Sequence, residues 1–158
     1  MYPCELKEFP TQPTLTKRFR TPLQQMQARL GEVYSAVIQH LEILGQAPSG
    51  APFVAYYNMD MQDLDIEAGF PVKSPLPGNA NVQASVIPRG VYVVCHYTGA
   101  YEGLAPAYEA LSRFAAERDY APSGVAYEWY LSSPDVPPEQ LKTDIAFPVT
   151  HIGEIHTV

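Results

Sequence analysis

The hydrophobic positions along this chain follow two periods, one typical of helices and one typical of strands. Apolar side chains recur every three or four residues over about 23–44 and again over about 101–118, which predicts two main helices. Alternating or continuously apolar stretches bounded by Pro, Gly and Asn predict strands. These lie near 3–8, 13–20, 52–58, 64–72, 82–87, 91–97, 125–132 and 142–149.

The ends of the first helix carry recognisable signals. Thr21 is expected to be the N-cap and Pro22 the first helical residue, where a missing N–H costs little. Gly45 follows the last periodic position and is expected to end the helix. In the second helix Pro106 must lie in the first turn.

The chain also repeats itself. The tetrapeptide APSG at 47–50 recurs at 121–124, and the tripeptide FPV at 70–72 recurs at 147–149. The same shift as for APSG aligns Leu30 with Leu104, Tyr34 with Tyr108, Phe53 with Tyr127, and Tyr56 with Tyr130. Several matches in one register indicate two copies of one module.

We therefore predict a single domain over 1–158 with a duplicated α+β fold. Each (β)βαββ module has an antiparallel sheet covered by one helix, and the two are expected to meet about a pseudo-twofold axis with a central groove. Repeat one is expected at about 1–73, a linker at 74–81 and repeat two at about 82–150.

Composition and charge restrict the classes of function that this protein can have. Seventeen acidic against 10 basic residues give a net charge of −7, which disfavours direct nucleic-acid binding. No apolar run reaches the roughly 18 residues of a membrane span, and the N-terminus does not resemble a signal peptide. With 2 cysteines, the expectation is a reduced cytoplasmic protein. No nucleotide-binding or hydrolase motif is present, and no cofactor is predicted.

One carboxylate, Glu128, lies among aromatic residues in the stretch YEWY. In a strand it shares a face with Tyr130, while Tyr127 and Trp129 share the other. The aromatic pair is expected to pack on the helix, which would direct Glu128 into the cleft. The first copy has Val54 at the equivalent position, so the scaffold does not require an acid there. The alternative is a solvent-exposed or salt-bridged strand glutamate.

Five further residues are candidate ligand contacts. Tyr56, Tyr92, Tyr97 and Tyr130 could form aromatic walls of the groove, although each could equally be a core tyrosine with a bonded hydroxyl. Glu67 is a candidate acid. It aligns with Asp144 in the second copy, so a structural role shared by both repeats is an alternative.

Two other clusters are weaker candidates. Cys95 and His96 are neighbours in a predicted strand and point to opposite faces, so a buried structural thiol is favoured over a catalytic dyad. His151, Glu154 and His156 could form a metal site on paper, but no second ligand cluster supports it and no metal is predicted.

Three segments resemble a known family. They are PFVAYYNMDMQDLDIEAGFPV (52–72), HYTGAYEGLAPAYEAL (96–111) and YEWYLSSPDVPPEQLKTDIAFPV (127–149). They are similar to the GyrI-like small-molecule-binding family, which is also the effector-binding domain of AraC-type and MerR-type transcription regulators. The resemblance implies a duplicated βαββ fold, a groove for hydrophobic, often cationic aromatic compounds, and a key acid that maps onto Glu128.

The resemblance implies a binding module that acts as a sensor or a sequestering protein, in transcription regulation or in a drug or toxin response. The sequence before the first predicted strand is too short for a helix-turn-helix, so a stand-alone form is expected. The alternatives are a hydrolase of reactive cyclopropane-type toxins using Glu128, a gyrase-inhibitor-like module with a protein partner, and a haem-binding relative. The oligomeric state is left open.

Overall fold

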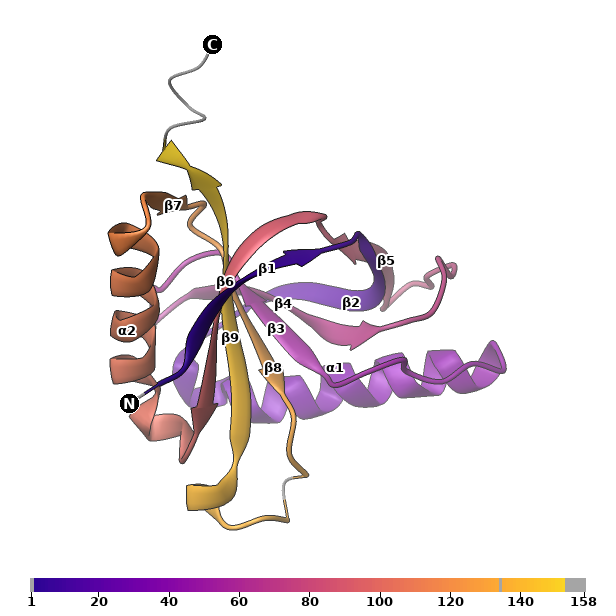
Figure 1. Cartoon of the computed structure of the whole chain (residues 1–158). Coiled ribbons are helices and arrows are strands. Elements are labelled where there is room, and N and C mark those ends of the chain that lie inside the picture. The colour runs from indigo at the N-terminus through magenta and orange to yellow at the C-terminus, as the bar shows by residue number, and fades with distance from the viewer. Residues whose placement is uncertain (1, 134, 153–158) are drawn as a thin grey trace. The chain divides into compact units, whose positions relative to one another are not determined.

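The computed structural model describes residues 2–133 and 135–152. The chain divides into two compact units. Their helices and strands are labelled in Figure 1. The continuous unit is Pro10–Arg89, and the split unit combines Met1–Phe9 with Gly90–Val158.

The continuous unit is an antiparallel sheet with one helix packed on it. Its elements are β2 (Gln12–Thr21), α1 (Leu23–Ile43), β3 (Phe53–Tyr56), β4 (Leu64–Pro71) and β5 (Gln83–Ile87). The strands are ordered β3-β4-β2-β5, and α1 packs on β4 and β2. The core of this unit includes Leu15, Val37, Leu41, Val72 and Val82.

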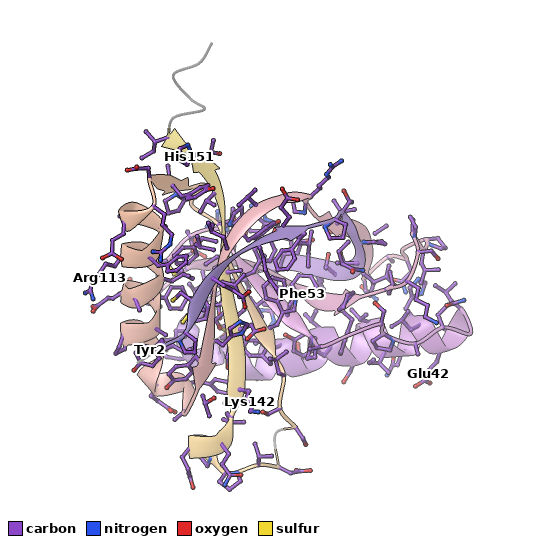
Figure 2. All side chains as sticks on the ribbon, in the orientation of Figure 1. Tyr2, Glu42, Phe53, Arg113, Lys142 and His151 are labelled. Atoms are coloured by element: carbon purple, nitrogen blue, oxygen red, sulfur yellow. The ribbon has the colours of Figure 1, made fainter. Side chains whose placement is uncertain are left out.

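The split unit has a corresponding arrangement. Its elements are β1 (Cys4–Phe9), β6 (Gly90–Thr98), η1 (Tyr101–Gly103), α2 (Leu104–Glu117), β7 (Tyr120–Pro122), β8 (Ala126–Tyr130), η2 (Pro138–Gln140) and β9 (Lys142–His151). The order is β1-β6-β9-β8, with the short β7 also paired to β9. Helix α2 lies against β6 and β7. In Figure 2, Arg113 projects from α2 away from the strands, and Lys142 and His151 mark the ends of β9.

The end of α1 follows the glycine signal, and its start does not follow the threonine signal. Gly45 has φ +68°, its N–H donates to the Glu42 carbonyl, and the next N–H donates to the Leu41 carbonyl, as in a Schellman motif. The expected Thr21 cap is wrong, because Thr21 ends β2 and its hydroxyl donates to the Pro22 carbonyl. Pro22 is the N-cap residue, without a side-chain cap.

The duplication is visible in equivalent backbone contacts. The Ser49 N–H donates to the Pro71 carbonyl over 2.9 Å, and the Ser123 N–H donates to the Pro148 carbonyl over the same distance. The two bonds hold one APSG segment against the last residue of β4 and the other against Pro148 within β9. The structure thus shows two copies of one α+β module, as the repeat predicts.

The compact units do not coincide with the repeats read from the sequence. Strand β1 pairs with β6 in the split unit, and β5 pairs with β2 in the continuous unit. The first strand, β1, therefore lies in the same unit as α2. The strand after the linker, β5, lies in the same unit as α1. A hydrophobic pattern indicates that a strand exists but does not identify its partner.

No helix among residues 2–133 and 135–152 is long and apolar enough to cross a membrane.

The pairing of β4 with β2 brings two backbones together at Gly69. A Cβ there would lie 2.0 Å from the Leu15 carbonyl oxygen and 2.8 Å from the Thr16 Cα. We expect Gly69→Ala to lower the free energy of unfolding by more than about 2 kcal/mol. Gly31→Ala in α1 is the control: its methyl group meets nothing within 4 Å, and it should add about 0.5–1 kcal/mol. Chemical unfolding followed by circular dichroism measures both. Equal stability of the two variants would contradict this close approach.

Candidate functional site

The carboxylate of Glu128 is buried and held by two tyrosine hydroxyls. The residue is only 5 % exposed. Its Oε1 accepts a hydrogen bond from Tyr130 over 2.7 Å, and its Oε2 accepts one from Tyr108. Tyr130 lies on β8 and Tyr108 on α2. Each hydrogen bond to a charged group contributes roughly 1.5–3 kcal/mol. The bond from Tyr108 joins β8 to α2.

The strand faces are the reverse of those expected. Because Tyr108 belongs to α2, the carboxylate lies on the helix side of β8, and the prediction that Tyr127 and Trp129 pack there is wrong. Their side chains point to the other face, where the Tyr127 ring lies 6.1 Å from Tyr92 and the Trp129 ring lies 6.0 Å from Phe9. Aromatic contacts cover that face too, so alternation could not distinguish the two sides.

A third tyrosine, Tyr101 in η1, completes the aromatic surroundings of Glu128. Its ring packs edge-on against Tyr130 with centroids 5.7 Å apart. Burial raises the pKa of the Tyr101 hydroxyl, and the negative charge of Glu128 raises it further. Tyr101 is still 38 % exposed, so this side of the site reaches solvent. Sequence reasoning missed Tyr101 as a site residue. It also missed Tyr108, whose match with Tyr34 was the available signal.

Tyr97 supports the turn that carries Tyr101. The Tyr97 hydroxyl donates to the Ala100 carbonyl over 2.6 Å. A Cβ at Gly99 or Gly103 would lie 2.7 or 2.4 Å from that hydroxyl, so only glycine lets the turn pass this closely over the ring. Tyr97 is therefore placed beneath the turn as a support.

Thr143 adds a buried polar atom on the same face. It lies on β9 directly opposite Tyr97 and Tyr130 and is fully buried. Within the described part of the chain, its hydroxyl has no hydrogen-bond partner. Such a group costs roughly 1–3 kcal/mol, and a bound molecule or a water could satisfy it.

The other two predicted contacts, Tyr56 and Glu67, lie in the continuous unit. The Tyr56 hydroxyl donates to the Met26 sulfur over 3.9 Å, on the α1 side. Glu67 accepts hydrogen bonds from Tyr57 and Thr16, both over 2.6 Å, on the opposite face. The structure therefore places these two residues on different faces of one sheet.

His96 connects three strands on the face opposite Glu128. Its Nε2 lies 2.6 Å from Glu5 of β1 and its Nδ1 lies 2.7 Å from Asp144 of β9. The hydrogen bonds with Glu5 and then Asp144 raise the pKa of His96. Cys95 is fully buried on the other face, so it and His96 point to opposite sides of β6, as the strand alternation predicts.

Of the three residues of the possible C-terminal metal site, only His151 is among the described residues. Glu154 and His156 lie outside the described residues. The His151 ring lies 5.0 Å from the Tyr120 ring in an edge-on contact. Among residues 2–133 and 135–152, no group of three or more His, Cys, Asp or Glu side chains could hold a metal ion.

Comparison with known proteins gives the class of this fold. A family model described as the GyrI-like small molecule binding domain matches residues 2–150. The chain therefore belongs to the GyrI-like family of small-molecule-binding domains. No curated protein sequence matches the chain.

Solved structures show the same fold at low sequence identity. The EcmrR chain in a DNA complex has a TM-score of 0.75 at 23 % identity; the match covers 94 % of this chain and 57 % of EcmrR. SAV2435 bound to tetraphenylphosphonium has a TM-score of 0.66 at 13 % identity, with 99 % and 98 % covered. A hydrolase from Listeria innocua has a TM-score of 0.70 at 13 % identity, with 93 % and 91 % covered.

The proximity of Glu128 and Tyr101 can be tested by titration. Because the carboxylate charge raises the pKa of Tyr101, Glu128→Gln should lower that pKa. Carbon-13 NMR of labelled tyrosine measures it, with Tyr101→Phe to assign the signal. Glu109→Gln, at an exposed position of α2, is the matched control and should leave the pKa unchanged. An unchanged value in Glu128→Gln would show that the two groups are not close.

Proposed function

We propose that this domain binds lipophilic aromatic cations through Glu128 and thereby senses or sequesters them. One observation carries the proposal. A carboxylate that is 5 % exposed is fixed between two tyrosine hydroxyls, and the resemblance of YEWY to the family maps the family's key acid onto it. The duplicated scaffold folds with Val54 at the equivalent site, so its architecture does not need the acid.

The physical basis is charge and aromatic complementarity. A cation beside a buried carboxylate gains more than it would in water, because the effective dielectric is lower. The rings of Tyr101, Tyr108 and Tyr130 surround that carboxylate, and a cation over a tyrosine face gains about 0.5–2 kcal/mol. The Thr143 hydroxyl could bond a polar group of the ligand. Ring contacts tolerate different shapes, so we expect broad specificity.

The relatives support this direction. SAV2435 was solved with tetraphenylphosphonium, a lipophilic aromatic cation, and EcmrR was solved on DNA. This chain spans 57 % of that EcmrR chain, so a regulatory role here is part of the proposal. We place the protein in the cytoplasm, in agreement with its two free cysteines.

Thermal-shift measurements with tetraphenylphosphonium test the proposal. A ligand that binds only the native state stabilises it by about 2.7 kcal/mol at a hundred times its Kd, which raises Tm by about 5–10 °C. We expect this rise in the wild type and its loss in Glu128→Gln. Triphenylphosphine oxide, a neutral compound of similar aromatic character, should give a much smaller shift.

Two further variants complete this experiment. Glu109→Gln makes the same chemical change at an exposed position and should keep the full shift. Glu67→Gln tests the second acid nominated by the sequence. Equal shifts with the cation and the neutral compound in both the wild type and Glu128→Gln would rule out Glu128 as the counter-ion.

A hydrolase is the second candidate function. It is favoured by the structural similarity to the Listeria innocua hydrolase and by the hydroxyl-bonded acid, which could transfer a proton or orient a water. Incubation with a cyclopropane-bearing electrophile, followed by mass spectrometry, distinguishes the two. The binding proposal expects the compound to be recovered intact. A water-added product that requires Glu128 would establish the hydrolase instead.

A further inference from the structure

The two cysteines face each other across neighbouring strands of the split unit. Cys4 of β1 and Cys95 of β6 are directly opposite in the antiparallel register. The adjacent residue His96 donates its N–H to the Pro3 carbonyl over 2.9 Å. Cys4 and Cys95 therefore form the next, non-hydrogen-bonded pair, where Cα atoms lie about 4.5 Å apart. This separation is within the range of about 4.4–6.8 Å that a disulfide requires.

The two thiols differ in accessibility. Cys95 is fully buried, and burial followed by the neighbouring Cys4 raises the pKa of its thiol to about 12. Cys4 is only partly buried, and its Sγ donates to the Tyr2 carbonyl over 3.4 Å. An oxidant arriving from solvent therefore meets Cys4 first, with Cys95 beside it as the second thiol.

We propose that Cys4 and Cys95 are a redox-active pair that forms an intramolecular disulfide when a peroxide oxidises Cys4. The Cys4 thiol loses its proton, and the thiolate attacks one oxygen of hydrogen peroxide. The O–O bond breaks, Cys4 becomes a sulfenic acid, and the hydroxide that leaves takes up the released proton to give water. Cys95 then attacks the Cys4 sulfur, the S–O bond breaks, and the released hydroxide takes the Cys95 proton and leaves as water. Overall, two thiols lose two hydrogen atoms and hydrogen peroxide becomes two molecules of water.

The disulfide would fix the outermost strand of the unit that carries the candidate site. Cys4, Cys95, Ile145 and Glu128 are successive partners across β1, β6, β9 and β8, on the helix-facing side. The bond would also close a loop that contains the whole continuous unit, since Pro10–Arg89 lies between the cysteines. Closing a long loop stabilises the folded state mainly by restricting the unfolded chain.

The test is peroxide treatment of the purified full chain. We expect an intact mass that is lower by two hydrogen atoms, a cross-linked peptide joining Cys4 to Cys95, and a Tm rise of about 5–15 °C that dithiothreitol reverses. Cys4→Ser, at a partly exposed position, should show neither the two-hydrogen loss nor the rise. Glu128→Gln should still form the bond, so the result is independent of the ligand proposal.

Three outcomes would overturn the proposal. One is two alkylatable thiols after peroxide treatment. The second is a disulfide-linked dimer on a non-reducing gel. The third is stable addition of oxygen to Cys4 without cross-linking, which would mean that Cys95 cannot reach it. Cys95→Ala gives a separate check, because its Cys4 should then accumulate the sulfenic acid that the wild type resolves.

Discussion

Burying one carboxylate is the constraint on which the site in the split unit depends. Removing an ionised group from water costs several kcal/mol unless hydrogen bonds replace the lost hydration. For Glu128 these bonds come from Tyr130 on its own strand and Tyr108 on the helix. Helix and strand must therefore keep a fixed separation. Tyr101 approaches the same acid through a turn that Tyr97 supports. The position of Glu128 therefore also constrains the position of η1.

The duplication shows which part of this arrangement is structural. In the continuous unit Tyr34 packs on Phe70 with ring centroids 5.3 Å apart, and in the split unit Tyr108 packs on Phe147 at 5.8 Å. A helix tyrosine against a strand phenylalanine is thus common to both modules. The Tyr34 hydroxyl donates to the Phe53 carbonyl, whereas the Tyr108 hydroxyl donates to Glu128. The second copy has therefore placed an acid within reach of a hydroxyl that both copies contain.

Local pattern and internal repeat predicted the two helices, most strands and the duplicated α+β class, because Gly45, the APSG segments and apolar spacing act over short distances. The broken symmetry with Val54 also marked Glu128 as a candidate ligand contact. The sequence could not show which strands pair with each other, or which face of each strand packs on a helix. Tyr127 and Glu128 are buried by different neighbours on opposite sides of one strand, and only the fold shows which side meets α2. Tyr101 is likewise brought near Glu128 by a turn whose geometry depends on Gly99 and Gly103.

Each unit is completed by an outer strand from the other repeat, β1 in the split unit and β5 in the continuous unit. This arrangement has a consequence for how the chain can be rearranged. Phe9 and Gly90 are paired residues of β1 and β6, although the whole continuous unit lies between them in sequence. Gln12 and Ile87, near the two ends of that unit, are paired as well. The continuous unit is thus connected like a domain inserted into the turn of a β-hairpin, with its entry and exit side by side. Such neighbouring ends are where circular permutation and domain insertion are usually tolerated. A cut between the two repeats, which would make each repeat a separate chain, would instead separate β1 and β5 from the sheets that they complete.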